Sequence, residues 1–266
     1  MTDLQHAIRE GHYAKKQIHS RDWLIAWSHR RRFQTAVELG KAFAGKCVLD
    51  YGCGDGTFLG LLMAERSAPA LAVGVETHAS TVEDCRRRYR VEPRLEFVLT
   101  SDLDRPEHRG RYDAVFCMEV LEHVLDPEPL LAQFTELLAP DGKLIVSVPV
   151  ETGLPLIAKQ AIRRLAGWRR LGDYPGTSSY GVRELVASLL AGRRQHIVRP
   201  VFRVGSGAAF YDHKGFNWMV LRETVAGRFE IERCVGSPVQ WLGPYLASQV
   251  CFVARPKAPG PRRAVR

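Results

Sequence analysis

The sequence has no run of about 18 consecutive apolar residues, so no helix is predicted to cross a membrane. Residues 1–10 are mostly polar and lack the apolar core of a secretory signal. None of the six cysteines belongs to a C-x-x-C pair, and Cys47, Cys117 and Cys251 lie within apolar runs, as reduced core thiols do. These absences together predict a cytoplasmic protein.

Repeats and low-complexity tracts are also absent, and the basic residues are unevenly distributed. Lys and Arg number 38 against 29 Asp and Glu, which gives a net charge of +9. The excess is clustered at 30–32, at 86–88, within 163–170 and in the C-terminal tail. Such clusters favour anionic partners, namely nucleic acid, phosphate-bearing substrates or an acidic membrane surface. Solvated helix faces explain them equally well.

Strand-like and helix-like segments alternate from residue 46 onward, which predicts an α/β fold with a mainly parallel sheet of about seven strands and helices on both faces. The predicted strands are 46–50, 71–76, 95–99, 112–118, 143–148, 229–235 and 248–254. The predicted helices are 57–64, 80–89, 128–138, 156–171, 183–190 and 215–225, with a further helix over 23–43 that Asp22 would cap. A turn is predicted at Pro140-Asp141-Gly142, before the fifth strand.

The same pattern divides the chain into parts. We expect a helical N-terminal cap over 1–45 and a catalytic domain over 46–255. Residues 150–212 break the strand–helix rhythm and are interpreted as an inserted lid, and 256–266 as a basic disordered tail.

The strongest local signal runs from Val48 to Thr57, where an apolar strand enters a glycine-rich turn and then a helix. Glycines let a ligand approach the backbone, and ligands of such sheets bind at the carboxyl ends of the strands. A dinucleotide site would have a third glycine where this chain has Thr57. Asp50 and Asp55 flank the turn, and two carboxylates would repel a pyrophosphate. The charge therefore favours S-adenosylmethionine, which carries an ammonium and a sulfonium but no phosphate.

Acids after the next two strands are placed to bind the rest of that cofactor. Glu76 ends the second predicted strand, where an acid can accept hydrogen bonds from ribose hydroxyls. Asp102 follows the third strand and could accept from the adenine amino group, although Asp104 is close by. Leu103 could offer its backbone N–H to the ring.

The segment from Cys47 to Val150 resembles the class I S-adenosylmethionine-dependent methyltransferases. The resemblance rests on D-x-G-C-G-x-G at Asp50, on Glu76, and on M-E-V-L-E-H-V from Met118 to Val124. The last of these is most similar to the ubiquinone-biosynthesis O-methyltransferase branch. The resemblance implies a Rossmann-like sheet and S-adenosylmethionine as the cofactor. The cofactor contacts it implies are Asp50, Gly52, Cys53, Gly54, Glu76, Asp102, Leu103 and Glu119.

Glu119, Glu122 and His123 are spaced i, i+3 and i+4, so a helical turn would place them on one face. Two carboxylates and an imidazole suit a divalent metal such as Mg²⁺, Mn²⁺ or Zn²⁺. Without an ion, Glu119 would line the cofactor pocket and His123 would form hydrogen bonds within the site.

A second resemblance concerns the segment from Tyr211 to Trp218. It is similar to a stretch of the small-RNA 3′-terminal 2′-O-methyltransferases, which also carry an E-x-x-E-H turn. The resemblance implies that His213 is a fourth metal ligand beside Glu119, Glu122 and His123. A metal-bound hydroxyl loses its proton more easily. Without a metal, His123 or His213 is the candidate general base.

The segment that begins at Leu156 and ends at Leu171 has apolar residues at helical spacing and basic residues on the other faces. A basic amphipathic helix that bears Trp168 can lie on an anionic membrane surface. By resemblance, an insertion at this place has that role in the ubiquinone branch. The interpretation favoured here is a lid over the acceptor pocket. Aromatic candidates for that pocket are Tyr174, Tyr180, Phe210, Tyr211 and Trp241.

Three functions are weighed on these grounds. The first is O-methylation of a small hydroxylated molecule such as a sugar, quinol, lipid or secondary metabolite. The second is metal-dependent 2′-O-methylation of RNA, which the basic charge supports but which lacks a recognisable RNA-binding module. The third is a non-catalytic protein that binds the cofactor as a sensor.

Overall fold

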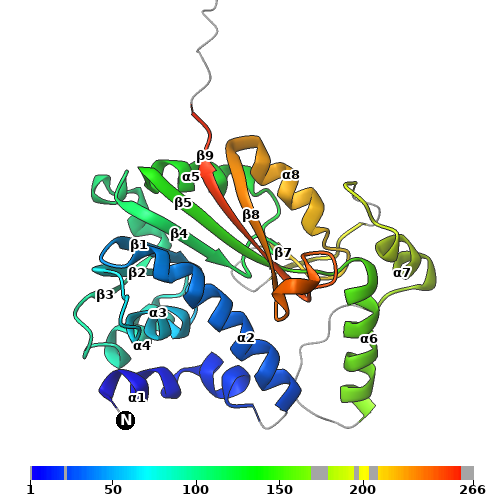
Figure 1. Cartoon of the computed structure of the whole chain (residues 1–266), viewed down its shortest axis with the longest axis horizontal. Coiled ribbons are helices and arrows are strands. Elements are labelled where there is room, and N and C mark those ends of the chain that lie inside the picture. Colours follow the sequence, from blue (N-terminus) through cyan, green and yellow to red (C-terminus); the bar gives the residue numbers. More distant parts are fainter. Residues whose placement is uncertain (1, 21–22, 169–178, 195–197, 204–208, 259–266) are drawn as a thin grey trace, which may run out of the picture.

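The computed structural model describes residues 2–20, 23–168, 179–194, 198–203 and 209–258. Its centre is a seven-stranded sheet in the order β3-β2-β1-β4-β5-β9-β8 (Figure 1). The first five strands of that order are parallel, and β9 pairs antiparallel with both β5 and β8. The strands are β1 (Cys47–Tyr51), β2 (Leu71–Glu76), β3 (Leu95–Leu99), β4 (Tyr112–Met118), β5 (Leu138–Pro149), β8 (Phe229–Ser237) and β9 (Gln249–Pro256). The predicted α/β sheet of about seven strands is confirmed.

Helices cover both faces of this sheet (Figure 1). On one face α3 (Thr57–Met63) and α4 (Ala79–Arg88) pack with the N-terminal helices α1 (Asp3–Glu10) and α2 (Trp23–Gly40). On the other face lie α5 (Glu128–Leu137) and α8 (Trp218–Arg228).

The central strands β1, β2 and β4 form because they are almost continuously apolar, as strands buried on both faces must be. In β1, Val48 and Leu49 are both fully buried, yet they belong to the apolar cores on opposite sides of the sheet. This alternation fixes the register of β1 at the sheet centre. The carboxyl ends of β1 and β4, which pair with each other, therefore meet at one edge.

The remaining elements are short turns, two further helices and a small hairpin. They are the π-helical segment Ala14–Ile18, the 3-10 turns Lys41–Phe43, Thr100–Asp104, Pro106–His108 and Gln240–Leu242, the helices α6 (Gly153–Trp168) and α7 (Val182–Leu189), and the hairpin strands β6 (Val201–Arg203) and β7 (Ala209–Tyr211). In the part of the chain that the structure describes, no helix has the length and apolar character needed to span a bilayer.

Three predictions about element bounds were wrong. The predicted turn at Pro140–Gly142 lies inside β5, where the pairing of β4 with β5 shifts register and the extra residues form a bulge. The β6–β7 hairpin falls within the predicted lid, where no strand was expected. Helix α8 begins at Trp218 rather than at 215, because the Asn217 side chain accepts the backbone N–H of Met219 at 3.0 Å and caps the helix there.

Other predictions fall on parts that the structure does not describe. The predicted cap Asp22, the end of the amphipathic segment at Leu171, and residues 259–266 of the tail lie outside the described residues. Strand β9 runs to Pro256, the first residue of the predicted tail.

Candidate functional site

The glycine loop after β1 follows a backbone course that few other residues could adopt. Gly52, Gly54 and Gly56 have φ angles of 74°, 54° and 73°. The N–H groups of Gly52 and Cys53 both donate to the carbonyl oxygen of Val75, at 2.9 and 3.0 Å. The loop is thus tied to the end of β2.

Side chains would not fit at two of these glycines even if the backbone allowed them. A Cβ on Gly52 would lie 2.5 Å from Cγ2 of Val120, and one on Gly54 would lie 2.7 Å from the ring of Tyr13. Both the close packing and the backbone conformation therefore require glycine at these two positions.

Two of the predicted cofactor acids flank this loop. Asp50 is 2% exposed, and its Oδ1 has no hydrogen-bond partner among the described residues. Burial, and then the nearby charge of Glu76, raise the pKa of the Asp50 carboxyl well above its usual value. Glu76 accepts the N–H of Gly54 at 3.2 Å through Oε2. A cationic ligand would relieve the electrostatic cost of two acids at one turn.

The other predicted cofactor residues are more constrained. The Asp102 carboxylate accepts the N–H of Leu99 at 3.1 Å and pairs with Arg105 at 2.8 Å, so part of its acceptor capacity is already used. Leu103 is 2% exposed. Cys53 is buried, and burial raises the pKa of its thiol well above the usual value.

The predicted N-terminal cap is joined to the loop by contacts that the sequence did not indicate. The N–H of Tyr13 donates to Oδ2 of Asp55 at 2.7 Å, while Oδ1 of Asp55 accepts the N–H of Thr57 at 3.0 Å. Arg88 on α4 donates to the carbonyl oxygens of Ala7 and Asp55, at 3.1 and 2.6 Å. The cap before β1 is therefore bonded to the loop directly.

Glu119 follows β4 in a strained conformation. Its φ is 58°, the one positive φ outside glycine among the described residues. Its Oε1 accepts from Nε2 of Gln249 at 2.7 Å and from Oγ of Ser147 at 3.3 Å, and its Oε2 lies 3.4 Å from Arg32. None of these three partners was anticipated, because each comes from a different element of the fold.

Three predicted metal ligands come together just beyond Glu119. Ligand atoms of Glu122, His123 and His213 all lie within 4.8 Å of one another. The centroids of the two imidazole rings are 4.6 Å apart. Glu119 is not part of this group, and its carboxylate accepts from Gln249 and Ser147 instead. The structure therefore brings together three of the four residues, across about 90 positions of sequence.

The protonation of this cluster follows from its hydrogen bonds. Nδ1 of His123 lies 2.8 Å from the carbonyl oxygen of Tyr211, which can only accept, so the neutral ring carries its proton there. Its Nε2 lies 3.9 Å from Oε1 of Glu122 and is the nitrogen that bears the lone pair in that neutral tautomer. A backbone partner on the other ring nitrogen is the usual arrangement of metal-binding histidines.

Glu122 is fully buried, and neither of its carboxylate oxygens has a hydrogen-bond partner among the described residues. Burial, and then the charge of Glu119, raise its pKa well above the usual value. Burial, and then the charge of His123, lower the pKa of His213, whose Nδ1 is buried and also unpartnered in the described structure. Buried oxygen and nitrogen atoms without a hydrogen-bond partner, as in Glu122 and His213, are expected where an ion or another ligand binds.

Some predicted pocket aromatics lie near the cluster. The Phe210 ring is 6.3 Å from that of His123, and Tyr211 bonds His123 through its backbone. Tyr180 accepts the N–H of Gly215 at 2.9 Å. Trp241 is 85% exposed, and Tyr174 lies outside the described residues.

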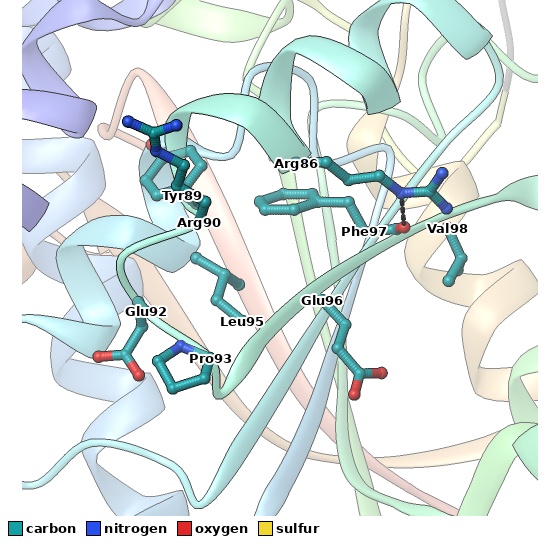
Figure 2. Close-up of a pocket in the computed structure, with 9 residues that line it drawn as sticks. All are labelled: Arg86, Tyr89, Arg90, Glu92, Pro93, Leu95, Glu96, Phe97 and Val98. Atoms are coloured by element: carbon teal, nitrogen blue, oxygen red, sulfur yellow. Dashed lines mark hydrogen bonds between the residues drawn. The ribbon is translucent and has the colours of Figure 1, made fainter.

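A separate cleft of about 370 Å³ lies at the β3 edge of the sheet (Figure 2). Its lining includes none of the predicted cofactor or metal residues. In Figure 2 the guanidinium of Arg86 lies over the edge strand, where its Nε donates to the carbonyl oxygen of Phe97 at 2.9 Å. This contact occupies a carbonyl group of the edge strand that would otherwise be free to pair with another chain, and it is not part of the candidate site.

Comparison with known proteins identifies related chains. The family model described as a methyltransferase domain matches residues 26–189. A ubiquinone biosynthesis O-methyltransferase of Neisseria meningitidis is 30% identical over 161 residues, which cover 55% of this chain and 65% of that protein. A protein of the same name from Psychrobacter arcticus is 37% identical over 124 residues, 43% of this chain and 44% of that protein.

The first curated relatives are matched over 30%, 36% and 65% of their own lengths, so the chain spans about a third to two thirds of each. Among solved structures, a putative S-adenosylmethionine-dependent methyltransferase of Listeria monocytogenes has a TM-score of 0.53 at 14% identity, over 85% of this chain and 98% of that one. The methyltransferase domain of bacterial CtHen1 has a TM-score of 0.51 at 19% identity, over the same shares of the two chains, 85% and 98%. These two structures share the fold of the chain.

Proposed function

Because this chain belongs to the methyltransferase domain family, we propose that it transfers a methyl group to a hydroxyl oxygen of a small molecule. The predicted class of enzyme, an S-adenosylmethionine-dependent methyltransferase, is confirmed by the family match. The observation that carries the finer proposal is the meeting of two features at one edge of the sheet. The acid-flanked glycine loop follows β1, and the Glu122–His123–His213 cluster lies beyond the adjacent strand β4.

The glycine loop fits the cofactor. The buried, unpartnered Oδ1 of Asp50 favours a cationic ligand, and glycines at positive φ, as at 52 and 54, let a backbone come close to a ligand. Glu76 is the residue we assign to the ribose hydroxyls, and Asp102 with Leu103 to the adenine. When bound, S-adenosylmethionine supplies an electrophilic methyl group.

The cluster is proposed to hold one divalent ion. Two imidazoles and one carboxylate match the donors that Mn²⁺ or Zn²⁺ accept, while Mg²⁺ prefers a shell of oxygen atoms alone. An ion there would make an acceptor hydroxyl more acidic. Glu122, His123 and His213 would bind it, with Glu119 placed outside the ligand set.

The chain's own groups account for the remaining chemistry. Methyl transfer needs a positioned nucleophile that has lost its proton. A lowered pKa keeps His213 neutral at physiological pH, so it can accept that proton if no ion is bound. The carbonyl oxygen of Tyr211 orients His123 for either role.

Residues 150–212 are proposed to form a lid on the acceptor side. Helices α6 and α7 pack together, and Lys214, next to His213, pairs with Glu184 of α7 at 2.9 Å. Contact with an anionic membrane through α6 is the alternative role. Leu154 and Ile157 near its start are 65% and 46% exposed, as such a contact would need.

The test is transfer of labelled methyl from S-adenosylmethionine by the full chain. Catechols, sugar alcohols and short RNAs would be offered with Mn²⁺ or with EDTA. We expect label in an ether of a small acceptor, lost with EDTA. Label in RNA, with a steep salt dependence, would favour the second function instead. Cofactor binding with no transfer to any acceptor would favour the sensor function.

A further inference from the structure

Arg199 is a cation in an unusual place. It precedes β6 and is partly buried, and among the described residues it forms no ion pair with a carboxylate. Its guanidinium lies 4.2 Å from the ring centroid of Tyr211 and 5.0 Å from that of Phe216. Burial lowers its pKa to about 10, which still leaves it charged at neutral pH. A half-buried charge is costly unless hydrogen bonds and aromatic rings offset the loss of water around it.

The polar contacts of Arg199 reach two segments that are distant in sequence. Its Nη2 donates to the backbone carbonyl oxygen of Glu122. The same atom donates to the carbonyl oxygen of Asp212 at 2.9 Å. One nitrogen therefore joins the turn that carries Glu122 and His123 to the residue directly before His213.

Backbone hydrogen bonds join the same two segments. The N–H of Tyr211 donates to the carbonyl oxygen of His123 at 2.9 Å, and the His123 ring donates back to Tyr211 at 2.8 Å. The N–H of Asp212 donates to the carbonyl oxygen of Pro200 at 3.2 Å, next to Arg199 itself. These bonds join His123 to the segment that carries Tyr211 and His213. The backbone of Glu122 is joined to the same segment through Arg199.

We propose that Arg199 is a positioning residue that holds Glu122 and His213 at ligand distance from each other. The proposal rests on the metal site suggested above. The carboxylate of Glu122 forms no hydrogen bond in the described structure. The orientation of this side chain therefore depends on the position of its backbone. Arg199 grips that backbone at the carbonyl, and the planar guanidinium stacked on Tyr211 and Phe216 prevents it from swinging away.

The test compares Arg199→Gln and Arg199→Lys with the parent chain. For each chain, titration calorimetry would measure the affinities for Mn²⁺ and for S-adenosylhomocysteine. Differential scanning calorimetry would measure Tm. The expected loss of Mn²⁺ affinity in Arg199→Gln is about 10–100-fold, as for other residues that orient metal ligands. Affinity for S-adenosylhomocysteine should stay within about twofold, which is under 0.5 kcal/mol.

Arg199→Lys keeps the charge but not the planar fork, so it should recover part of the Mn²⁺ affinity. Arg86→Gln is the matched control. Arg86 also donates to a backbone carbonyl, that of Phe97, but at the β3 edge (Figure 2). It should leave Mn²⁺ affinity unchanged.

The outcomes separate the two proposals. A parent chain that binds no Mn²⁺ overturns the metal site and with it the role of Arg199. A parent that binds Mn²⁺ while both folded Arg199 variants bind it equally well overturns the positioning role alone. If Arg199→Gln does not fold, Arg199→Lys decides: reduced Mn²⁺ affinity at unchanged S-adenosylhomocysteine affinity supports the proposal, and parental affinity for both overturns it.

Discussion

The glycine loop and the histidine cluster lie at the ends of neighbouring strands but are built in opposite ways. The loop is one continuous segment after β1, shaped by positive φ angles and backbone hydrogen bonds to β2. The cluster joins side chains from two segments about 90 residues apart, with unpartnered donor atoms on Glu122 and His213. The shape of the glycine loop is therefore set mainly by its own backbone. The cluster depends on tertiary contacts for its geometry.

This difference predicts how each part fails. Backbone sites are damaged by added bulk, whereas side-chain clusters are damaged by the loss of a donor. Cofactor binding should be independent of the cluster ligands, because no hydrogen bond among the described residues joins their ligand atoms to the glycine loop. Substitutions in each part can test that independence.

The largest expected effect is on the cluster. His213→Ala should lower Mn²⁺ affinity by at least about 100-fold, because even residues that only orient ligands contribute about 10–100-fold. Affinity for S-adenosylhomocysteine, measured in the same calorimeter, should remain at the parental value. His19→Ala, at an exposed position of the N-terminal cap, serves as the control. If His213→Ala lowered the affinities for Mn²⁺ and for S-adenosylhomocysteine equally, the loop and the cluster would not be independent sites.

The loop is tested by added bulk. Gly52→Ala would place a Cβ 2.5 Å from Val120 at a φ of 74°. We expect a loss of about 1–2 kcal/mol from the backbone and about 1–3 kcal/mol from overpacking in the free energy of unfolding. Cofactor affinity should fall about tenfold or more, since each 1.4 kcal/mol of lost contact is tenfold.

Gly45→Ala is the matched control for that change. Gly45 has a φ of 70°, but its Cβ would meet nothing within 4 Å. It should lose only the backbone contribution of about 1–2 kcal/mol and keep full cofactor affinity. Urea unfolding and calorimetry measure both quantities. If the two alanine variants behaved alike, close packing at the loop would not matter.

The same contrast explains what the sequence could predict. Strands β2, β3 and β4 have the predicted bounds. For β2 and β4 the reason is that strands buried on both faces leave nearly continuous apolar runs. The hairpin β6–β7 was missed, because its first strand is exposed and short and has no such run. The bulge in β5 was mistaken for a turn, because Pro140, Asp141 and Gly142 are turn residues by composition.

For the candidate site, the loop could be predicted from contiguous residues, while the proximity of His123 and His213 was implied only by family resemblance. The contacts of Tyr13, Gln249 and Arg199 could not be predicted. Each acts through a partner far away in sequence, and no local pattern marks it. Glu119 was expected to join the metal ligands, because i, i+3, i+4 spacing suggests one helical face. The structure has a bend and a turn there rather than a helix, and the Glu119 carboxylate accepts from Gln249 outside the cluster.

A smaller effect is expected from the buried acid of the loop. The pKa of Asp50 is raised in the folded chain, so the folded state keeps a proton that the unfolded state releases. Stability should therefore fall as pH rises from about 4 toward the folded pKa. Asp50→Asn removes this fall and should be more stable at pH 8, by on the order of 1 kcal/mol.

The measurement is urea unfolding of the parent and Asp50→Asn chains at pH 5 and pH 8. Their difference should grow with pH, and cofactor affinity should drop in the variant. Asp141→Asn, at an exposed position of β5, should show neither change. A pH-independent difference between Asp50→Asn and the parent would mean that burial of the Asp50 charge is not what opposes folding.

The most local effect concerns the link between loop and cap. Asp55→Ala removes the acceptor of two N–H groups, those of Tyr13 and Thr57, and should cost about 1–2 kcal/mol of unfolding free energy. Asp126→Ala removes a similar bond, to the N–H of Glu128 at the start of α5, but no link to the cap. Only Asp55→Ala should therefore accelerate hydrogen exchange at the Tyr13 amide. If both variants left that amide equally protected, the cap would be held by its apolar packing on α3 and α4, and the loop would need no cover bonded to it to keep its shape.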